Sequence, residues 1–122
     1  MMRKDTLSIQ EVKDFLDQHL YEAHSIAALC RRFSINREKL QNGFRALASC
    51  TVHSYILHRR MERAAKRLRE SNDPIKSVAL DSGYKKQRSF NKTFKAVYRQ
   101  TPAGYRRLHQ EYSQAPFITK NT

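Results

Sequence analysis

Two stretches of the sequence carry side chains that can hydrogen-bond to the edges of DNA bases. The first stretch contains Arg37, Glu38, Gln41, Asn42 and Arg45, and the second, 50 residues later, contains Gln87, Arg88, Asn91, Lys92 and Lys95. Arginine and lysine can pair with guanine N7 and O6, glutamine and asparagine with adenine N6 and N7, and glutamate can accept from cytosine N4. Helical spacing places each set on one face. The pattern is typical of major-groove reading, although an ordinary solvated helix face can have the same composition.

The same offset of 50 residues relates apolar and turn residues around these two stretches. Leu40, Phe44 and Tyr55 correspond to Phe90, Phe94 and Tyr105, and Thr51 corresponds to Thr101. Repetition at a fixed offset indicates one supersecondary unit used twice. The residues that we expect to form the structural core of the two units are Leu29, Leu40, Phe44, Tyr55, Ala79, Gly83, Phe90, Phe94, Pro102 and Tyr105.

Capping residues and apolar periodicity predict the helices that position the two stretches. Ser8, in a capping box with Glu11, starts a helix over about 9–20. Ser25 and Asn36 start the next two helices, and Thr51 starts a long one over about 52–71. Asp73 before Pro74, the turn at Gly83 and Thr101 before Pro102 define the last three, over about 74–80, 86–97 and 102–108.

The predicted fold class is all-α, with about seven helices and no convincing strand pattern. Two helices joined by a three- or four-residue turn form a helix-turn-helix, and the sequence predicts two such subdomains joined by a long linker helix. The expected organisation is an N-terminal helix-turn-helix subdomain over 1–50, a linker helix over 51–72, a C-terminal helix-turn-helix subdomain over 73–109 and a flexible tail over 110–122.

The charge of the chain favours a polyanionic partner. Twenty-four Lys and Arg against 11 Asp and Glu give a formal net charge of +13 and a pI near 10.2. Neutralising phosphates releases counterions from nucleic acid, although charge alone fits a ribosomal protein or a membrane-surface binder equally well. No apolar run is long enough for a membrane span, and the N-terminus lacks a signal-peptide core. We expect a soluble cytoplasmic protein associated with the nucleoid and not with membrane.

The chain shows no pattern of an enzyme or a metal centre. The first four of its five histidines, His19, His24, His53 and His58, fall in two pairs spaced five residues apart, unlike the four-residue spacing of a zinc-binding helix. Cys30 and Cys50 fall at packing and turn positions and form no disulfide framework. Since there is also no glycine-rich phosphate loop and no activated-serine motif, we expect no catalysis, no metal and no cofactor.

Four motifs resemble the AraC/XylS family of transcription regulators. They occupy residues 60–68, 78–84, 89–95 and 101–106, and the similarity covers about residues 8–108. The resemblance implies two helix-turn-helix subdomains whose third and sixth helices enter successive major grooves on one face of double-stranded DNA. It also implies activation of transcription through contact with RNA polymerase.

The chain departs from this family at several turn positions. Family members commonly have alanine at position 30 and glycine at positions 34 and 49, where this sequence has Cys30, Ser34 and Ser49. The second subdomain keeps its turn glycine as Gly83 but has Arg99 at the later glycine position. Ser34 and Ser49 then have to take conformations that glycine adopts more easily, at a cost of about 1 kcal/mol each if φ is positive.

The expected complex with DNA involves backbone contacts as well as base reading. Amides at helix starts and nearby basic or hydroxyl groups can hold phosphates, and the candidates are Ser25, Thr51, Lys85, Lys86, Arg106 and Arg107. Glu38 either reads cytosine or pairs with Arg37 or Asn42. A linker of roughly 19 residues spans about 28 Å, and major-groove faces recur about every 34 Å. We therefore expect a monomer on an asymmetric site, with DNA bending as a further hypothesis.

Two alternatives remain open at the level of sequence. The chain is either a stand-alone regulator or the DNA-binding half of a longer ligand-responsive one, and it has no room for a small-molecule ligand domain of its own. The other alternative is a basic RNA-binding or protein-interaction module. RNA readers usually present exposed aromatic platforms, whereas most aromatic residues here fall on the buried faces of the expected helices.

Overall fold

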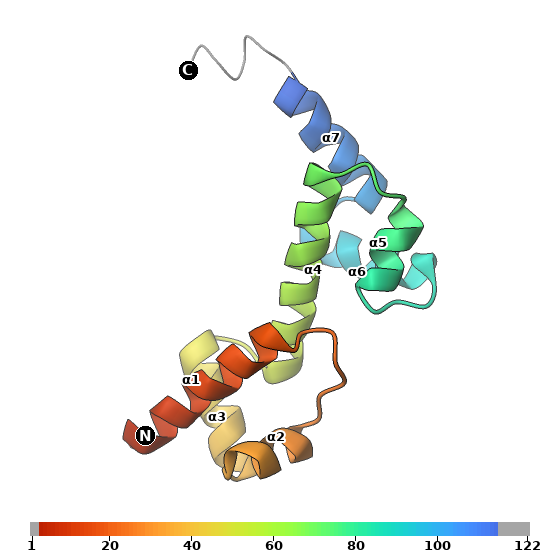
Figure 1. The fold of residues 1–122 in the computed structure, drawn as a ribbon. Coiled ribbons are helices and arrows are strands. Elements are labelled where there is room, and N and C mark those ends of the chain that lie inside the picture. The colour runs from red at the N-terminus through yellow and green to blue at the C-terminus, as the bar shows by residue number, and fades with distance from the viewer. Residues whose placement is uncertain (1–2, 115–122) are drawn as a thin grey trace, which may run out of the picture. The chain divides into compact units, whose positions relative to one another are not determined.

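The structure, a computed structural model, describes residues 3–114 and contains only α-helices in that part of the chain (Figure 1). The all-α fold predicted from the sequence is confirmed. The helices are α1 (Arg3–Gln18), α2 (Ile26–Phe33), α3 (Arg37–Ala48), α4 (Val52–Glu70), α5 (Ile75–Asp81), α6 (Gln87–Tyr98) and α7 (Pro102–Gln114). None of the described helices is long and apolar enough to cross a membrane.

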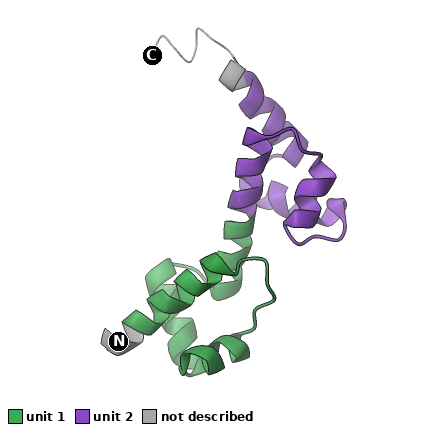
Figure 2. Ribbon diagram, viewed as in Figure 1, with its two compact units in different colours: residues 1–60 green, residues 61–122 purple. Residues whose placement is uncertain are grey.

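The chain divides into two compact units, residues 1–60 and residues 61–122 (Figure 2). The division falls inside α4, so the first part of this helix belongs to unit 1 and the remainder to unit 2. Each unit therefore contains part of the long helix and one helix-turn-helix pair, α2–α3 in unit 1 and α5–α6 in unit 2.

Unit 1 is built around the contact of α1 and α2 with α3. Its core consists of fully buried apolar side chains on these helices, among them Val12, Leu16, Leu29, Leu40 and Phe44. Side-chain caps fix where the helices begin, as the sequence predicted. The Ser25 hydroxyl accepts from the Ala28 amide at 3.1 Å, and the Asn36 side-chain Oδ1 accepts from the Lys39 amide at 2.8 Å. The caps fix where α2 and α3 begin, and the buried Leu40 and Phe44 turn the apolar face of α3 inward.

Unit 2 repeats this plan with α5, α6 and α7 around the second part of α4. Its buried side chains are Met61, Ala64, Ala65 and Leu68 of α4 together with Val78, Ala79, Phe90, Phe94, Pro102 and Tyr105. Gly83 has a φ of 96° in the turn between α5 and α6, a region that glycine enters without steric cost. The Thr101 hydroxyl caps α7 through the Gly104 amide at 3.1 Å.

Three expected helix ends are wrong. Helix α1 begins at Arg3, so Ser8 lies inside a helix and not at its start. Asp73 does not cap α5, because its carboxylate accepts from Arg67 at 2.9 Å and Pro74 takes the cap position without a side-chain bond. Helix α7 continues to Gln114, beyond the predicted end near 108. The rest of the expected tail, residues 115–122, lies outside the described residues.

Three helices end in left-handed backbone, and one predicted core residue is wrong. Ser34 and Ser49 have positive φ values of 52° and 62° and end α2 and α3, and Arg99, with a φ of 63°, ends α6 in the same way. Gly83 is exposed, because it forms the turn itself and has no side chain to bury. Tyr55 is half-buried, and the remaining predicted core residues are buried.

Candidate nucleic-acid interface

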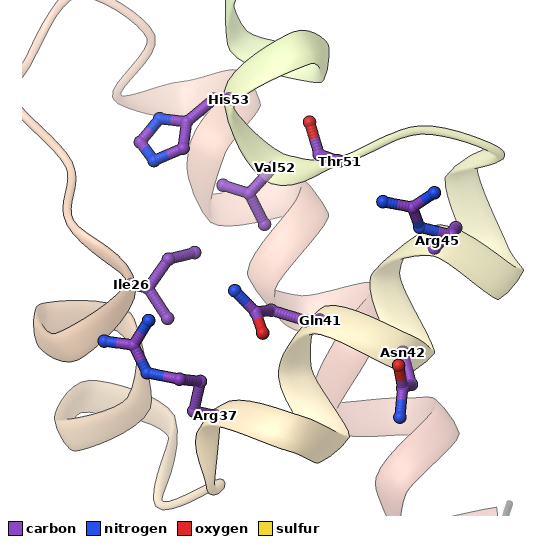
Figure 3. Close-up of a pocket in the computed structure, with 8 residues that line it drawn as sticks. All are labelled: Ile26, Arg37, Gln41, Asn42, Arg45, Thr51, Val52 and His53. Carbon is purple, nitrogen blue, oxygen red and sulfur yellow. The ribbon is translucent and has the colours of Figure 1, made fainter.

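The predicted reading face of α3 lines a hollow on unit 1 (Figure 3). The hollow has a volume of about 540 Å³ and is bordered by three elements. Helix α3 contributes Arg37, Gln41, Asn42 and Arg45, the start of α2 contributes Ile26, and the start of α4 contributes Thr51, Val52 and His53. The structure thus brings together four of the five side chains that the sequence assigned to base reading on this helix.

The five predicted side chains of α3 are all exposed. None of them makes a hydrogen bond or ion pair with another residue in the part of the chain that the structure describes. Glu38 does not line the hollow and is not paired with Arg37 or Asn42. The donors and acceptors of this face therefore remain available to a ligand in solution.

Four of the five predicted side chains of α6 are presented in the same way. Gln87, Arg88, Lys92 and Lys95 are exposed and without a polar partner among residues 7–111. Asn91 is different, because it is half-buried and its Oδ1 atom is covered without a hydrogen-bond donor. It directly follows the buried Phe90, which places it at the edge of the packed face. The assumption that Asn91 points outward like its neighbours is therefore wrong.

Four arginines of α4 are engaged within the protein. Arg59 donates to Asp17 at 3.1 Å, and Arg60 donates to the carbonyl oxygens of Leu20 and Glu22 at 2.8 and 3.1 Å. Arg67 binds the carboxylates of Asp73 and Asp81, and Arg69 donates to the Tyr105 hydroxyl at 2.7 Å. These guanidinium groups stabilise the unit in which each lies. These four arginines are therefore structural, whereas the exposed cations of α3 and α6 are available to bind a polyanion.

The Asp17 carboxylate links α1 to the first part of α4. It accepts from the Tyr55 hydroxyl at 2.5 Å and from Arg59. Burial raises the pKa of Asp17, but the bonds from Tyr55 and Arg59 outweigh this effect, so the pKa lies below its ordinary value. Burial and the bond to Asp17 raise the pKa of Tyr55 to about 12. Tyr55 is thus a structural wedge, and its ring also packs against Phe44.

Five of the six candidate phosphate contacts are exposed, and one is half-buried. Ser25, Thr51, Lys85, Lys86 and Arg107 are exposed, and the first two also cap α2 and α4. Arg106 is half-buried, since its Nε donates to the Leu68 carbonyl at 3.1 Å and one of its terminal nitrogens is covered. Arg106, a candidate phosphate contact, instead has its guanidinium engaged at the carbonyl end of α4.

One residue at the hollow was missed from the sequence. His53 is exposed in the first turn of α4 and lines the hollow opposite α3 (Figure 3). The sequence pattern suggested only metal binding as a possible role for the histidines, and no cluster of metal-ligating side chains occurs among the described residues. The signal that could have found it is its place two residues after the predicted cap Thr51, at a helix start already assigned to phosphate contact.

Comparison with known proteins agrees with this geometry. A family model described as a helix-turn-helix domain matches residues 29–108. The chain is 32% identical over 98 residues to the regulatory protein SoxS of Salmonella typhimurium, an overlap that covers 80% of this chain and 92% of SoxS. It is 27% identical over 107 residues to the multiple antibiotic resistance protein MarA of Escherichia coli, covering 88% of this chain and 84% of MarA.

The same arrangement of helices occurs in a solved structure of a DNA-bound domain. The DNA-binding domain of AdpA, a global transcriptional factor crystallised with a target DNA, matches with a TM-score of 0.75 at 22% identity. The match covers 88% of this chain and 96% of that domain, and at this identity it shows the fold. With the family model and the SoxS relationship, it establishes that the chain belongs to the AraC/XylS family of helix-turn-helix DNA-binding transcription regulators, a family of transcription factors rather than of enzymes.

Proposed function

We propose that this chain binds double-stranded DNA in a sequence-specific manner, with α3 and α6 as its two reading helices. The observation that carries the proposal is that both helices present exposed basic and amide side chains without a polar partner among the described residues, whereas four arginines of α4 are engaged within the protein. A free donor loses little by moving from water to a base edge. A guanidinium already held by a carboxylate would first have to break that bond.

The two helices contribute differently in this proposal. Helix α6 presents Arg88, Lys92 and Lys95 with no acidic residue between them, so it supplies more of the affinity. Helix α3 carries Glu38 beside Arg37. The phosphates repel this carboxylate, and a hydrogen bond from a cytosine N4 amine can offset the repulsion. Binding through α3 therefore depends more strongly on the base sequence.

The proposed complex places the two reading helices in successive major grooves of one duplex. A single protein molecule then occupies an asymmetric site, and deformation of the DNA adds preference at base steps that the protein does not touch. The proposed outcome in the bacterial cytoplasm is activation of transcription through contact with RNA polymerase. Promoter transcription with purified polymerase tests that last step, and repression would contradict it.

The test of the proposal is a selection of binding sites from random duplexes, which gives the site, its length and its symmetry. Arg88→Ala or Lys92→Ala should weaken binding by about 1–3 kcal/mol and relax the preference at one position. Lys66→Ala is the matched control, because it removes the same charge from an exposed position on α4. It should leave the base preference unchanged.

Competition with single-stranded DNA and structured RNA at physiological salt completes this test. The proposal requires that the selected duplex is preferred over both competitors. It would be refuted by a preference for RNA, and the assignment of α6 would be refuted by an Arg88→Ala protein that selects the same sequences as the parent.

A further inference from the structure

His53 differs from the other described histidines in having no partner among the residues that the structure describes. His19 bonds to Glu22, His24 to the His19 carbonyl and His58 to the Ser54 carbonyl. The ring of His109 lies 4.1 Å from that of Tyr105. His53 has no hydrogen bond, ion pair or ring contact with any residue in the described part of the chain, and its imidazole projects from the start of α4 at the edge of the hollow, on the side of Ile26 (Figure 3).

The charged groups that line this hollow are all cationic. Arg37 and Arg45 reach it from α3, whereas α2 contributes only Ile26 and the rest of the α4 start is uncharged. Among the described residues no carboxylate lines it, and Glu38 of α3 lies outside. His53 and the two guanidinium groups therefore line one hollow at the start of α4, where the helix also presents its positive end.

A DNA phosphate in the hollow would bring a negative charge to these groups. The imidazolium could donate an N–H to a phosphate oxygen in a charge-assisted hydrogen bond. Histidine is the side chain whose charge ordinarily changes between pH 5 and 8. Binding of DNA and uptake of a proton at this position should then favour each other, since the coupling of two bound ligands is reciprocal.

We propose that His53 is a proton-linked contact of unit 1 with the DNA backbone, which makes the affinity for DNA rise as the pH falls. The inference rests on the proposed function of α3. On binding, one proton is taken up from solvent by the imidazole, and no covalent bond changes. The expected effect is roughly a three- to tenfold tighter dissociation constant at pH 6 than at pH 8, within the tenfold per pH unit that one linked proton allows.

The experiment measures fluorescence anisotropy with the selected duplex from about pH 6 to pH 8 at constant ionic strength. The parent protein is compared with His53→Gln, which keeps a polar side chain without the titrating charge, and with His53→Arg, which keeps a permanent charge. The matched control is His58→Gln, since His58 is an exposed histidine on the same helix that bonds to a backbone carbonyl.

The proposal expects His53→Gln to bind weakly with a flat pH dependence and His53→Arg to bind tightly with a flat one. His58→Gln should keep the slope of the parent. Calorimetry of the parent in buffers of different ionisation enthalpy should show proton uptake on binding, which His53→Gln removes. Circular dichroism verifies that each variant is folded, and the calorimetric result for the parent tests the proposal even if one variant is not.

The outcomes separate the inference from the function on which it rests. Sequence-specific duplex binding with the parent slope retained in His53→Gln, or with no proton uptake by the parent, would overturn the inference alone. Absence of duplex binding at every pH would overturn the proposed function and the inference together.

Discussion

Replacing Ser34 and Ser49 by glycine should stabilise unit 1, although each change deletes atoms. Both serines lie in the left-handed region, with φ values of 52° and 62°. Their amides close α2 and α3 by donating to the carbonyls of Cys30 and Arg45, and glycine would keep these bonds. Their side chains are exposed and have no hydrogen bond among the described residues. The substitutions therefore change mainly the energy of the backbone.

The magnitude follows from two opposing effects. A left-handed conformation costs a residue with a Cβ atom roughly 1–2 kcal/mol. Glycine has more freedom in the unfolded chain, which costs roughly 0.5–1 kcal/mol. The net gain should be about 0.5–1 kcal/mol for each site, or about 1–2 kcal/mol for the double variant if the sites are additive. For a unit of this size, each change corresponds to a rise in Tm of roughly 2–8 °C.

Thermal and urea unfolding followed by circular dichroism would measure these effects in the full chain. Ser89→Gly provides a matched control, because Ser89 is exposed but lies within α6, where glycine should destabilise by about 0.5 kcal/mol. The reasoning is refuted if Ser34→Gly and Ser49→Gly lower the free energy of unfolding as Ser89→Gly does. Such a result would mean that the backbone is not strained at the two turns.

Three other substitutions test the packing and the caps of unit 1. Tyr55→Phe removes the bond to Asp17 and should lower the free energy of unfolding by about 1–2 kcal/mol. Because the folded pKa of Tyr55 is raised to about 12, the parent should lose stability in urea unfolding as the pH rises from about 10 through 12, and Tyr55→Phe should not show this loss. Phe44→Ala empties a fully buried site and should cost about 3–5 kcal/mol, seen in NMR as loss of dispersed amide signals from residues 1–60 with those of unit 2 retained. Asn36→Ala should cost about 1 kcal/mol in urea unfolding and Asn36→Asp much less, since the carboxylate can still accept from the Lys39 amide. Equal stability of the parent and any one of the Tyr55→Phe, Phe44→Ala or Asn36→Ala proteins would contradict the role assigned to that side chain.

Helix starts were predictable from the sequence where no other group binds the side chain of the capping residue. Ser25, Asn36 and Thr51 bond to the amides that the capping rule assigns to them. Asp73 follows the same rule in sequence, but the rule does not include Arg67, which comes from the preceding helix and binds the carboxylate. The end of α7 was missed for a similar reason. Gln110 donates to the Ser71 carbonyl, a tertiary bond that supports an additional helical turn.

The candidate site was predictable to the extent that helical periodicity decides exposure. Periodicity placed nine of the ten reading residues on exposed faces, and it failed for Asn91, at the edge where α6 meets its core. It could not predict that Arg106 reaches across to the Leu68 carbonyl, because that bond joins residues 38 positions apart. The same limit applies to His53, which lines a hollow that exists only when α2, α3 and α4 have packed together.

Only the cations that are not bonded within the protein can contribute fully to the attraction of DNA. A charge of +13 attracts DNA, but the salt dependence of binding counts only the phosphates that the protein neutralises, at about 0.9 per contact. Arg69 donates to Tyr105, so its loss should reduce the stability of unit 2 and leave the salt slope nearly unchanged. Loss of Arg88 should reduce the salt slope and leave the stability of unit 2 nearly unchanged, because that side chain has no polar partner in the described part of the chain. If both losses changed the salt slope equally, the bond from Arg69 to Tyr105 would not persist on DNA, and the distinction between structural and DNA-binding cations would be wrong.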